Sequence, residues 1–149
     1  MKIEEAIRQK KFANNRQKGM VNLIYTNNWL INKQSVLLKQ FGITLQQFNI
    51  LRILRGQFPK PATIKLIKKR MLDHMSDASR IVEKLRIKEL AERKVCPNDR
   101  RNVDVIITNK GLALLAEIDE RKNEMDGFMS NLSDQELLQL NQLLDKLRG

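Results

Sequence analysis

Residues 74–111 read HMSDASRIVEKLRIKELAERKVCPNDRRNVDVIITNKG, and this stretch decides the fold. Its first part, from Ser76 to Leu90, has helical periodicity. The apolar positions fall on one side of the expected helix: Ile81, Val82, Leu85 and Leu90. The polar positions are left for another side: Asp77, Ser79, Arg80, Lys84 and Lys88. Ser76 is expected to cap this helix, because its hydroxyl can accept a free backbone N–H of the first turn.

The second part of the stretch, from Arg93 to Ile107, alternates as strands do. Its apolar side chains are expected to point one way: Val95, Val103, Val105 and Ile107. Between the two short strands, residues 97–102 form a turn-forming tip with two adjacent arginines. A winged helix reads duplex DNA with such parts, since the helix fits the major groove and the tip reaches an adjacent minor groove.

The same residues carry a family resemblance. They resemble the wing signature of the MarR family of bacterial transcriptional regulators through Asp99-Arg100-Arg101, Val103, Val105, Ile107-Thr108 and Gly111, which follow a helix of the form SDASRIVEKL. The resemblance covers roughly the whole chain and is strongest from Arg52 to Gly111. It departs at Glu89, where the family often has Gly after the recognition helix. A non-glycine residue in a left-handed cap costs about 1 kcal/mol, so the helix could end differently here.

The resemblance implies a mainly α fold with a small β-hairpin wing, in a single domain over residues 1–149. Residues 43–111 would form a winged helix-turn-helix DNA-binding lobe. Residues 1–42 and 112–149 would form helical dimerisation regions. The resemblance further implies a homodimer, in which Arg101 is the residue inserted into the minor groove.

Local patterns fill in the helices before the wing. A long helix is expected from Met20 to Phe41, with Gly19 interrupting the chain before it. Residues 44–47, TLQQ, form a capping box that starts the next helix. Pro61 is expected to start a helix over residues 62–70, since proline is tolerated best at the first helical position. That short helix and the Ser76 helix make a helix-turn-helix.

The chain after the wing is expected to form one long helix capped by Thr108, then a last helix that starts at the capping box Ser133–Glu136. The last helix is rich in leucine at positions 137, 138, 140, 143, 144 and 147. This surplus favours association with a second copy of the chain. Simple packing on the chain's own long helix is the alternative.

Charge is distributed unevenly along the chain, which has a formal net charge of +11. Residues 60–101 are strongly basic, whereas residues 112–149 hold more acids than bases. This asymmetry indicates one surface that faces a polyanion, although a solvated lysine surface would look similar. The side chains expected to contact phosphates are Lys60, Lys65, Lys69, Arg93 and Lys94.

Residues near the start of the Ser76 helix are expected to enter the groove. Ser76, Asp77 and Ser79 are short enough to approach closely, and Arg80 can bind guanine with two hydrogen bonds. Lys84, one turn later, is better placed for a phosphate. Ser76 could instead serve only as a cap, and Asp77 only as a first-turn acid favoured by the helix dipole.

The tip supplies a second set of candidates. Arg100 or Arg101 would enter a narrow minor groove, where the negative potential is enhanced. Asp99 would brace one of these arginines by a salt bridge, or bond its own backbone as turn residues do.

Other residues are given structural interpretations. Cys96 is expected to be a half-buried strand residue rather than a redox sensor, and His74 a polar linker residue. Trp29 and Tyr25 could line a ligand pocket, but packing in the core is the favoured interpretation. No metal site or cofactor is expected, because one cysteine and one histidine offer too few ligands. The chain also lacks the motifs of nucleotide-binding and hydrolytic enzymes, so catalysis is not expected.

The N-terminus lacks the apolar run of a secretion signal, and no stretch suits a membrane span, so a cytoplasmic location is expected. The interpretation is a sequence-specific DNA-binding regulator. It would act as a homodimer and a repressor on a pseudo-palindromic operator, and a small molecule would release it. The alternative is a winged-helix interaction module with only non-specific affinity for nucleic acid.

Overall fold

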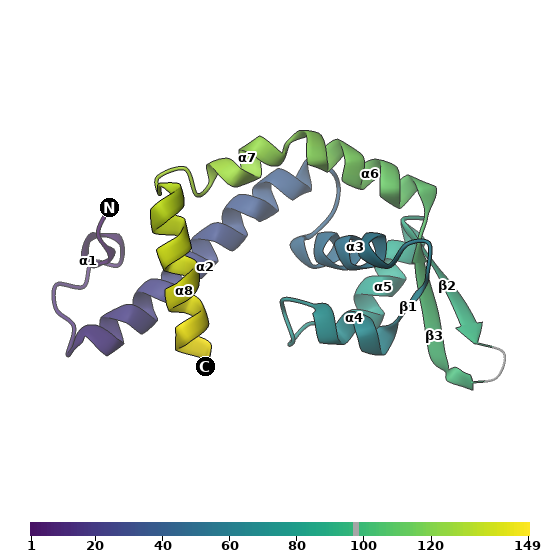
Figure 1. The fold of residues 1–149 in the computed structure, drawn as a ribbon, viewed down its shortest axis with the longest axis horizontal. Helices are drawn as coiled ribbons and strands as arrows, with labels where there is room; N and C mark the ends of the chain where they lie inside the picture. The colour runs from purple at the N-terminus through teal and green to yellow at the C-terminus, as the bar shows by residue number, and fades with distance from the viewer. Residues whose placement is uncertain (97–98) are drawn as a thin grey trace.

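Helices make up most of the chain, and a small antiparallel sheet lies at one end of it (Figure 1). The computed structural model describes the backbone of residues 1–96 and 99–149 and the side chains of residues 1–95 and 103–149. The helices in this part of the chain are α1 (Ile3–Ala6), α2 (Asn15–Lys39), α3 (Leu45–Gln57), α4 (Ile64–Arg70), α5 (Ala78–Ile87), α6 (Asn109–Glu120), α7 (Lys122–Gly127) and α8 (Asp134–Arg148). The strands are β1 (Ala62–Thr63), β2 (Ala91–Cys96) and β3 (Asp99–Ile107). The predicted fold class is therefore confirmed. We call α3, α4, α5 and the three strands the lobe.

The predicted hairpin is present as β2 and β3, whose pairing runs from Ala91 opposite Ile107 to Val95 opposite Val103. Val105 and Ile107 are buried, as their alternation predicts, whereas Val95 is exposed. In Figure 1, β2 and β3 extend beyond the helices of the lobe, so only the part of the hairpin next to those helices can be covered by them. We call this hairpin the wing.

The strand β1 corrects the prediction that a helix begins directly after Pro61. Ala62 pairs with Val105 and gives the sheet the order β1-β3-β2. The helix starts only at Ile64, because the Thr63 side chain accepts the backbone N–H of Leu66 (3.1 Å) and caps it. A two-residue strand is too short to show a periodicity of its own.

The cap of α5 was also predicted wrongly, by one residue, because Asp77 and not Ser76 is the N-cap. Asp77 caps the helix, since its Oδ1 accepts the backbone N–H of Arg80 (3.2 Å). The Ser76 hydroxyl instead donates to Oδ2 of Asp73 (2.5 Å). This bond lowers the pKa of the Asp73 carboxyl below its ordinary value.

The end of α5 adopts the left-handed conformation that glycine usually takes. Glu89 has φ +61°. Its N–H donates to the carbonyl of Arg86 (2.9 Å), and the N–H of Leu90 donates to the carbonyl of Leu85 (2.9 Å). These two bonds define a Schellman cap, and Leu85 and Leu90 are both buried beside it. The left-handed cap therefore forms at α5 although a glutamate, and not a glycine, stands there.

Two other boundaries differ from the prediction. Gly19 does not interrupt a helix, because α2 begins earlier, at the cap Asn14, and runs through it. The single long helix expected after the wing is divided into α6 and α7 at Arg121, whose backbone is not helical (φ −99°, ψ 19°). The caps at Thr44, Thr108 and Ser133 are confirmed.

Arg121 holds this break in place. Its guanidinium donates to Gln40 Oε1 (2.5 Å) at the end of α2 and to both carboxylate oxygens of Glu124 (2.6 Å each). The guanidinium carbon also lies 5.6 Å from the centre of the Phe41 ring. On the other side of the break, Asp119 of α6 binds Arg55 of α3 (2.6 Å).

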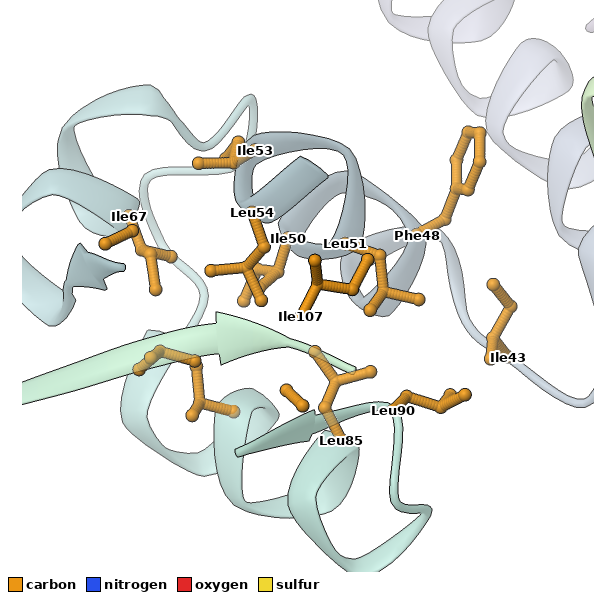
Figure 2. Close-up of a cluster of buried hydrophobic side chains, with 14 of the residues drawn as sticks. Ile43, Phe48, Ile50, Leu51, Ile53, Leu54, Ile67, Leu85, Leu90 and Ile107 are labelled. Carbon is orange, nitrogen blue, oxygen red and sulfur yellow. The ribbon is translucent and has the colours of Figure 1, made fainter. Parts of the chain in front are cut away.

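Most of the hydrophobic core belongs to the lobe and to α6, with Leu38 of α2 also contributing. Figure 2 shows Ile50, Leu51 and Leu54 of α3 pointing toward the same cluster as Leu85 of α5 and Ile107 of β3. By contrast, α2 buries only Leu37 and Leu38 near its end, and α8 buries no residue. No helix in the described ranges is both long enough and apolar enough to span a membrane.

Candidate nucleic-acid interface

The polar side of α5 faces solvent. Its opposite side buries Ala78, Val82 and Leu85 in the core of the lobe, and this packing fixes which side chains remain outside. Ser79, Arg80 and Lys84 are exposed. The helical periodicity thus predicted which face of α5 is accessible.

Most of the predicted recognition residues come together around one concave site. The α3–α5 hollow, of about 320 Å³, is lined by Thr44, Gln46, Gln47, Ser76, Asp77, Arg80, Ile81 and Lys84. Ser79 lies outside it but is exposed on the same helix. Two of the short polar residues are engaged in structure, because Asp77 caps α5 and Ser76 bonds Asp73. Arg80 and Lys84 are the two cations that this hollow presents.

The candidate phosphate contacts fall into two groups. Lys60, Lys65 and Lys69 are exposed on α4 and the loop before β1, and Lys94 is exposed on β2. Arg93 differs from them, because its Nη1 lies 2.9 Å from Oε2 of Glu83. Its guanidinium is therefore already bound to a carboxylate of α5.

Glu83 is the functional candidate that the sequence analysis missed. Arg86 donates from Nε to both carboxylate oxygens (3.1 Å each) and from Nη2 to Oε1 (2.7 Å), while Arg93 binds from β2. The hydrogen bonds from Arg86 and then from Arg93 lower the pKa of Glu83 to about 2. The spacing of Glu83 and Arg86 could have indicated the first pair, but nothing in the sequence indicates the second.

Lys88 is exposed, as predicted, and stands at the C-cap of α5. Its Nζ donates to the carbonyl oxygen of Gly42 (2.5 Å) and to Oε1 of Gln47 (3.0 Å). Lys88 is the last residue before the left-handed cap, so its side chain turns toward the start of α3. It links two elements of the lobe.

A third set of candidates belongs to the tip of the wing. The backbone of β3 includes Asp99, Arg100 and Arg101, but their side chains lie outside the described residues, as does that of Cys96. The predicted roles of the tip arginines and of Asp99 remain predictions. His74 is exposed in the connection between α4 and α5.

A second concave site lies between α2 and α7. The α2–α7 groove, of about 400 Å³, is lined by Trp29, Asn32, Lys33, Val36, Leu37, Gln40, Glu124 and Phe128. Trp29 is 40% exposed and Tyr25 39% exposed, so neither packs in the core as expected. Among the described residues, no three His, Cys, Asp or Glu side chains gather in a way that could hold a metal ion.

Comparison with known proteins agrees with this geometry. A model of the MarR family matches residues 41–102, which cover most of the lobe. The chain is 31% identical over 107 residues to the HTH-type transcriptional regulator MhqR of Bacillus subtilis, covering 71% of this chain and 72% of MhqR.

Solved structures share the fold over nearly the whole chain. A mutant MarR from E. coli complexed with operator DNA is 25% identical, with a TM-score of 0.76 over 92% of this chain and 99% of that one. The organohalide-sensing regulator RdhR-CbdbA1625, in its 2,4-dichlorophenol-bound form, is 18% identical, with a TM-score of 0.82 over 94% and 85%. The chain belongs to the MarR family of transcriptional regulators, which are not enzymes.

Proposed function

We propose that this regulator is a homodimeric repressor that binds a pseudo-palindromic operator. Two copies of α5 would enter successive major grooves about 34–36 Å apart, one in each half-site. The observation that carries the proposal is that Arg80 and Lys84 stand exposed on α5 while the opposite side of the helix is sealed into the core. A solved relative, MarR from E. coli, is complexed with operator DNA.

Each predicted residue has a proposed part in this complex. Arg80 would bind a base edge, with Ser76, Asp77 and Ser79 close to the groove floor. Lys84 would bind a phosphate, as would a wider set of cations: Lys60, Lys65, Lys69, Arg93 and Lys94. In the wing, Arg101 or Arg100 would enter the minor groove, braced by Asp99.

The proposed division of the chain places DNA binding in residues 43–111 and dimerisation in residues 1–42 and 112–149. Support comes from the distribution of exposed apolar side chains. They recur along α2, where Ile24 is 64% exposed, and along α8, where Leu143 is 64% and Leu147 67% exposed. Burial of such a side chain stabilises an interface by about 1.5–3 kcal/mol, and a second copy of the chain would bury several.

We further propose a small-molecule effector that releases the operator. The α2–α7 groove is a candidate site, because Trp29 and Phe128 give it aromatic walls beside the charged Lys33. Support comes from RdhR-CbdbA1625, a protein of the same fold that binds 2,4-dichlorophenol. The proposed dimer has one spacing of its two lobes that can bind DNA and another that cannot. The effector must have the higher affinity for the spacing that cannot bind DNA.

Binding to duplex DNA at several salt concentrations tests the core of the proposal. The operator is first selected from a random duplex pool with the wild-type protein. The regulator should prefer it to scrambled duplex by about 10³-fold or more at physiological salt. Weak, sequence-blind and strongly salt-dependent binding would instead indicate the alternative, an interaction module with incidental affinity for nucleic acid.

A further inference from the structure

The position of Glu83 is unusual for an acidic residue. It lies one turn after Arg80 on α5, half-buried beside the exposed residues that we propose face DNA. A carboxylate on such a surface repels phosphates. A structural reason is therefore needed for its presence between Arg80 and the cations Lys84 and Arg86.

The contacts of Glu83 supply that reason. Its carboxylate is shared by Arg86, which belongs to the same helix, and by Arg93, which belongs to β2. The bond to Arg93 is the one that joins two elements. The hydrogen bonds from Arg86 and Arg93 lower the pKa of Glu83 to about 2, so the carboxylate is ionised at the neutral pH of a DNA-binding experiment.

The place of Arg93 in the sheet explains what that bond controls. Arg93 lies opposite Val105, which is fully buried, so its backbone is anchored at the base of the wing. The strand order β1-β3-β2 leaves β2 at an edge of the sheet. The Glu83–Arg93 bond therefore joins α5 to the strand of the wing that lies at this edge.

We propose that Glu83 is a positioning residue for operator binding, which holds Arg93 and thereby sets the wing at the angle at which α5 and the wing engage neighbouring grooves together. This inference rests on the proposed function, in which both elements contact DNA. Glu83 acts through Arg93 and does not itself touch the duplex.

The substitution Glu83→Gln distinguishes a positioning role from a purely electrostatic effect, because the two predict opposite changes in affinity for the operator. Removing a negative charge near DNA should tighten binding to every duplex. Loss of positioning should weaken binding to the selected operator by about fivefold or more, while scrambled duplex binds as tightly as before or more tightly. The specificity ratio should therefore fall.

Glu92→Gln is the matched control. Glu92 is the exposed neighbour of Arg93 on β2, and within the described side chains it makes no ion pair. Its substitution removes the same charge close by, and it should tighten operator and scrambled duplex alike. Arg93→Gln should lower the specificity ratio as Glu83→Gln does, but it also removes a proposed phosphate contact and should weaken binding to scrambled duplex. The double variant should have the same specificity ratio as Arg93→Gln alone.

Hydroxyl-radical footprinting on the operator provides a readout that a general loss of stability would not change. In Glu83→Gln, protection of the minor groove at the outer flank should decrease while protection at the α5 site persists. Operator binding by Glu83→Gln at wild-type strength or tighter would overturn the positioning role and leave the proposed function intact. A wild-type protein without sequence preference would overturn the proposed function itself.

Discussion

At the scale of single residues, Arg80 and Lys65 represent the two kinds of contact on which specific DNA binding depends. Arg80 lines the α3–α5 hollow, and a guanidinium there can read the edge of a guanine. Lys65 is exposed on α4, where a single positive charge can bind phosphate without reading sequence. Removal of the Arg80 side chain should therefore affect DNA binding differently from removal of the Lys65 side chain.

Arg80→Ala should relax the preference at one base position by about 1–3 kcal/mol, because a bidentate base contact is lost. Lys65→Ala should weaken binding to all duplexes equally and reduce the slope of log K against log[salt] by about one unit. Fluorescence anisotropy with single-base variants of the selected operator measures both effects. A change of base preference in Lys65→Ala would contradict the assignment.

The candidate site was predictable only in part at this scale. Periodicity placed Arg80 and Lys84 on the accessible side of α5, because the face that packs in the core is visible in the order of apolar residues. The pairing of Glu83 with Arg93 and the turn of Lys88 toward Gly42 depend on how the hairpin and α3 lie against α5. No local pattern encodes those distances.

At the scale of elements, α5 is a short helix whose two ends are both determined by specific residues. Asp77 caps its start, and the Schellman cap closes its end with Glu89 in the left-handed region. The chain passes from Leu90 directly into β2, so any strain in this cap lies between the proposed recognition helix and the wing.

Glu89→Gly should raise the free energy of unfolding by up to about 1 kcal/mol, because glycine adopts a positive φ without steric cost. The ion pair that is lost, Glu89 with Lys110 at 3.3 Å, is exposed and contributes little. Urea denaturation at fixed protein concentration measures the change. Glu89→Ala is the control and should bring no gain, since alanine keeps the strain; an equal gain in both variants would refute the explanation.

The elements that the sequence predicted well are those with a capping pattern and a buried stripe, such as α3 and α5. Those it missed are defined by tertiary contact. β1 exists because Ala62 pairs with Val105, and the break between α6 and α7 coincides with the contacts of Arg121 to Gln40 and Glu124. Helix propensity alone would start α4 directly after Pro61 and would continue α6 into α7 without a break.

At the scale of the whole molecule, burial is concentrated in the lobe and α6, while α2 and α8 leave large apolar side chains in solvent. A protein of this size does not usually expose such surfaces without a partner. Replacement of two leucines of α8 should therefore disrupt self-association more than it disturbs the lobe.

The double variant Leu143→Lys, Leu147→Lys should be monomeric at micromolar concentration, where the wild type is expected to be a dimer. It should also bind the operator more weakly, because a monomer engages one half-site. Sedimentation velocity gives the masses. Leu72→Lys is the control, since Leu72 is 86% exposed but lies between α4 and α5, and the dimer should persist. A dimeric double variant would contradict the proposed interface.

The break at Arg121 has a consequence for how the proposed effector could move the lobe. α6 is fixed to the lobe by the Arg55–Asp119 pair, and Figure 1 places the wing and α7 at opposite ends of this assembly. Under the proposed function, a ligand in the α2–α7 groove would contact α7 close to the break at Arg121, because Glu124 belongs to that helix and Phe128 directly follows it. Because α6 is tied to the lobe, a small shift of α7 at the break would move the lobe farther at its distant end. A compound the size of one aromatic ring could then separate the two α5 helices of the proposed dimer from their grooves.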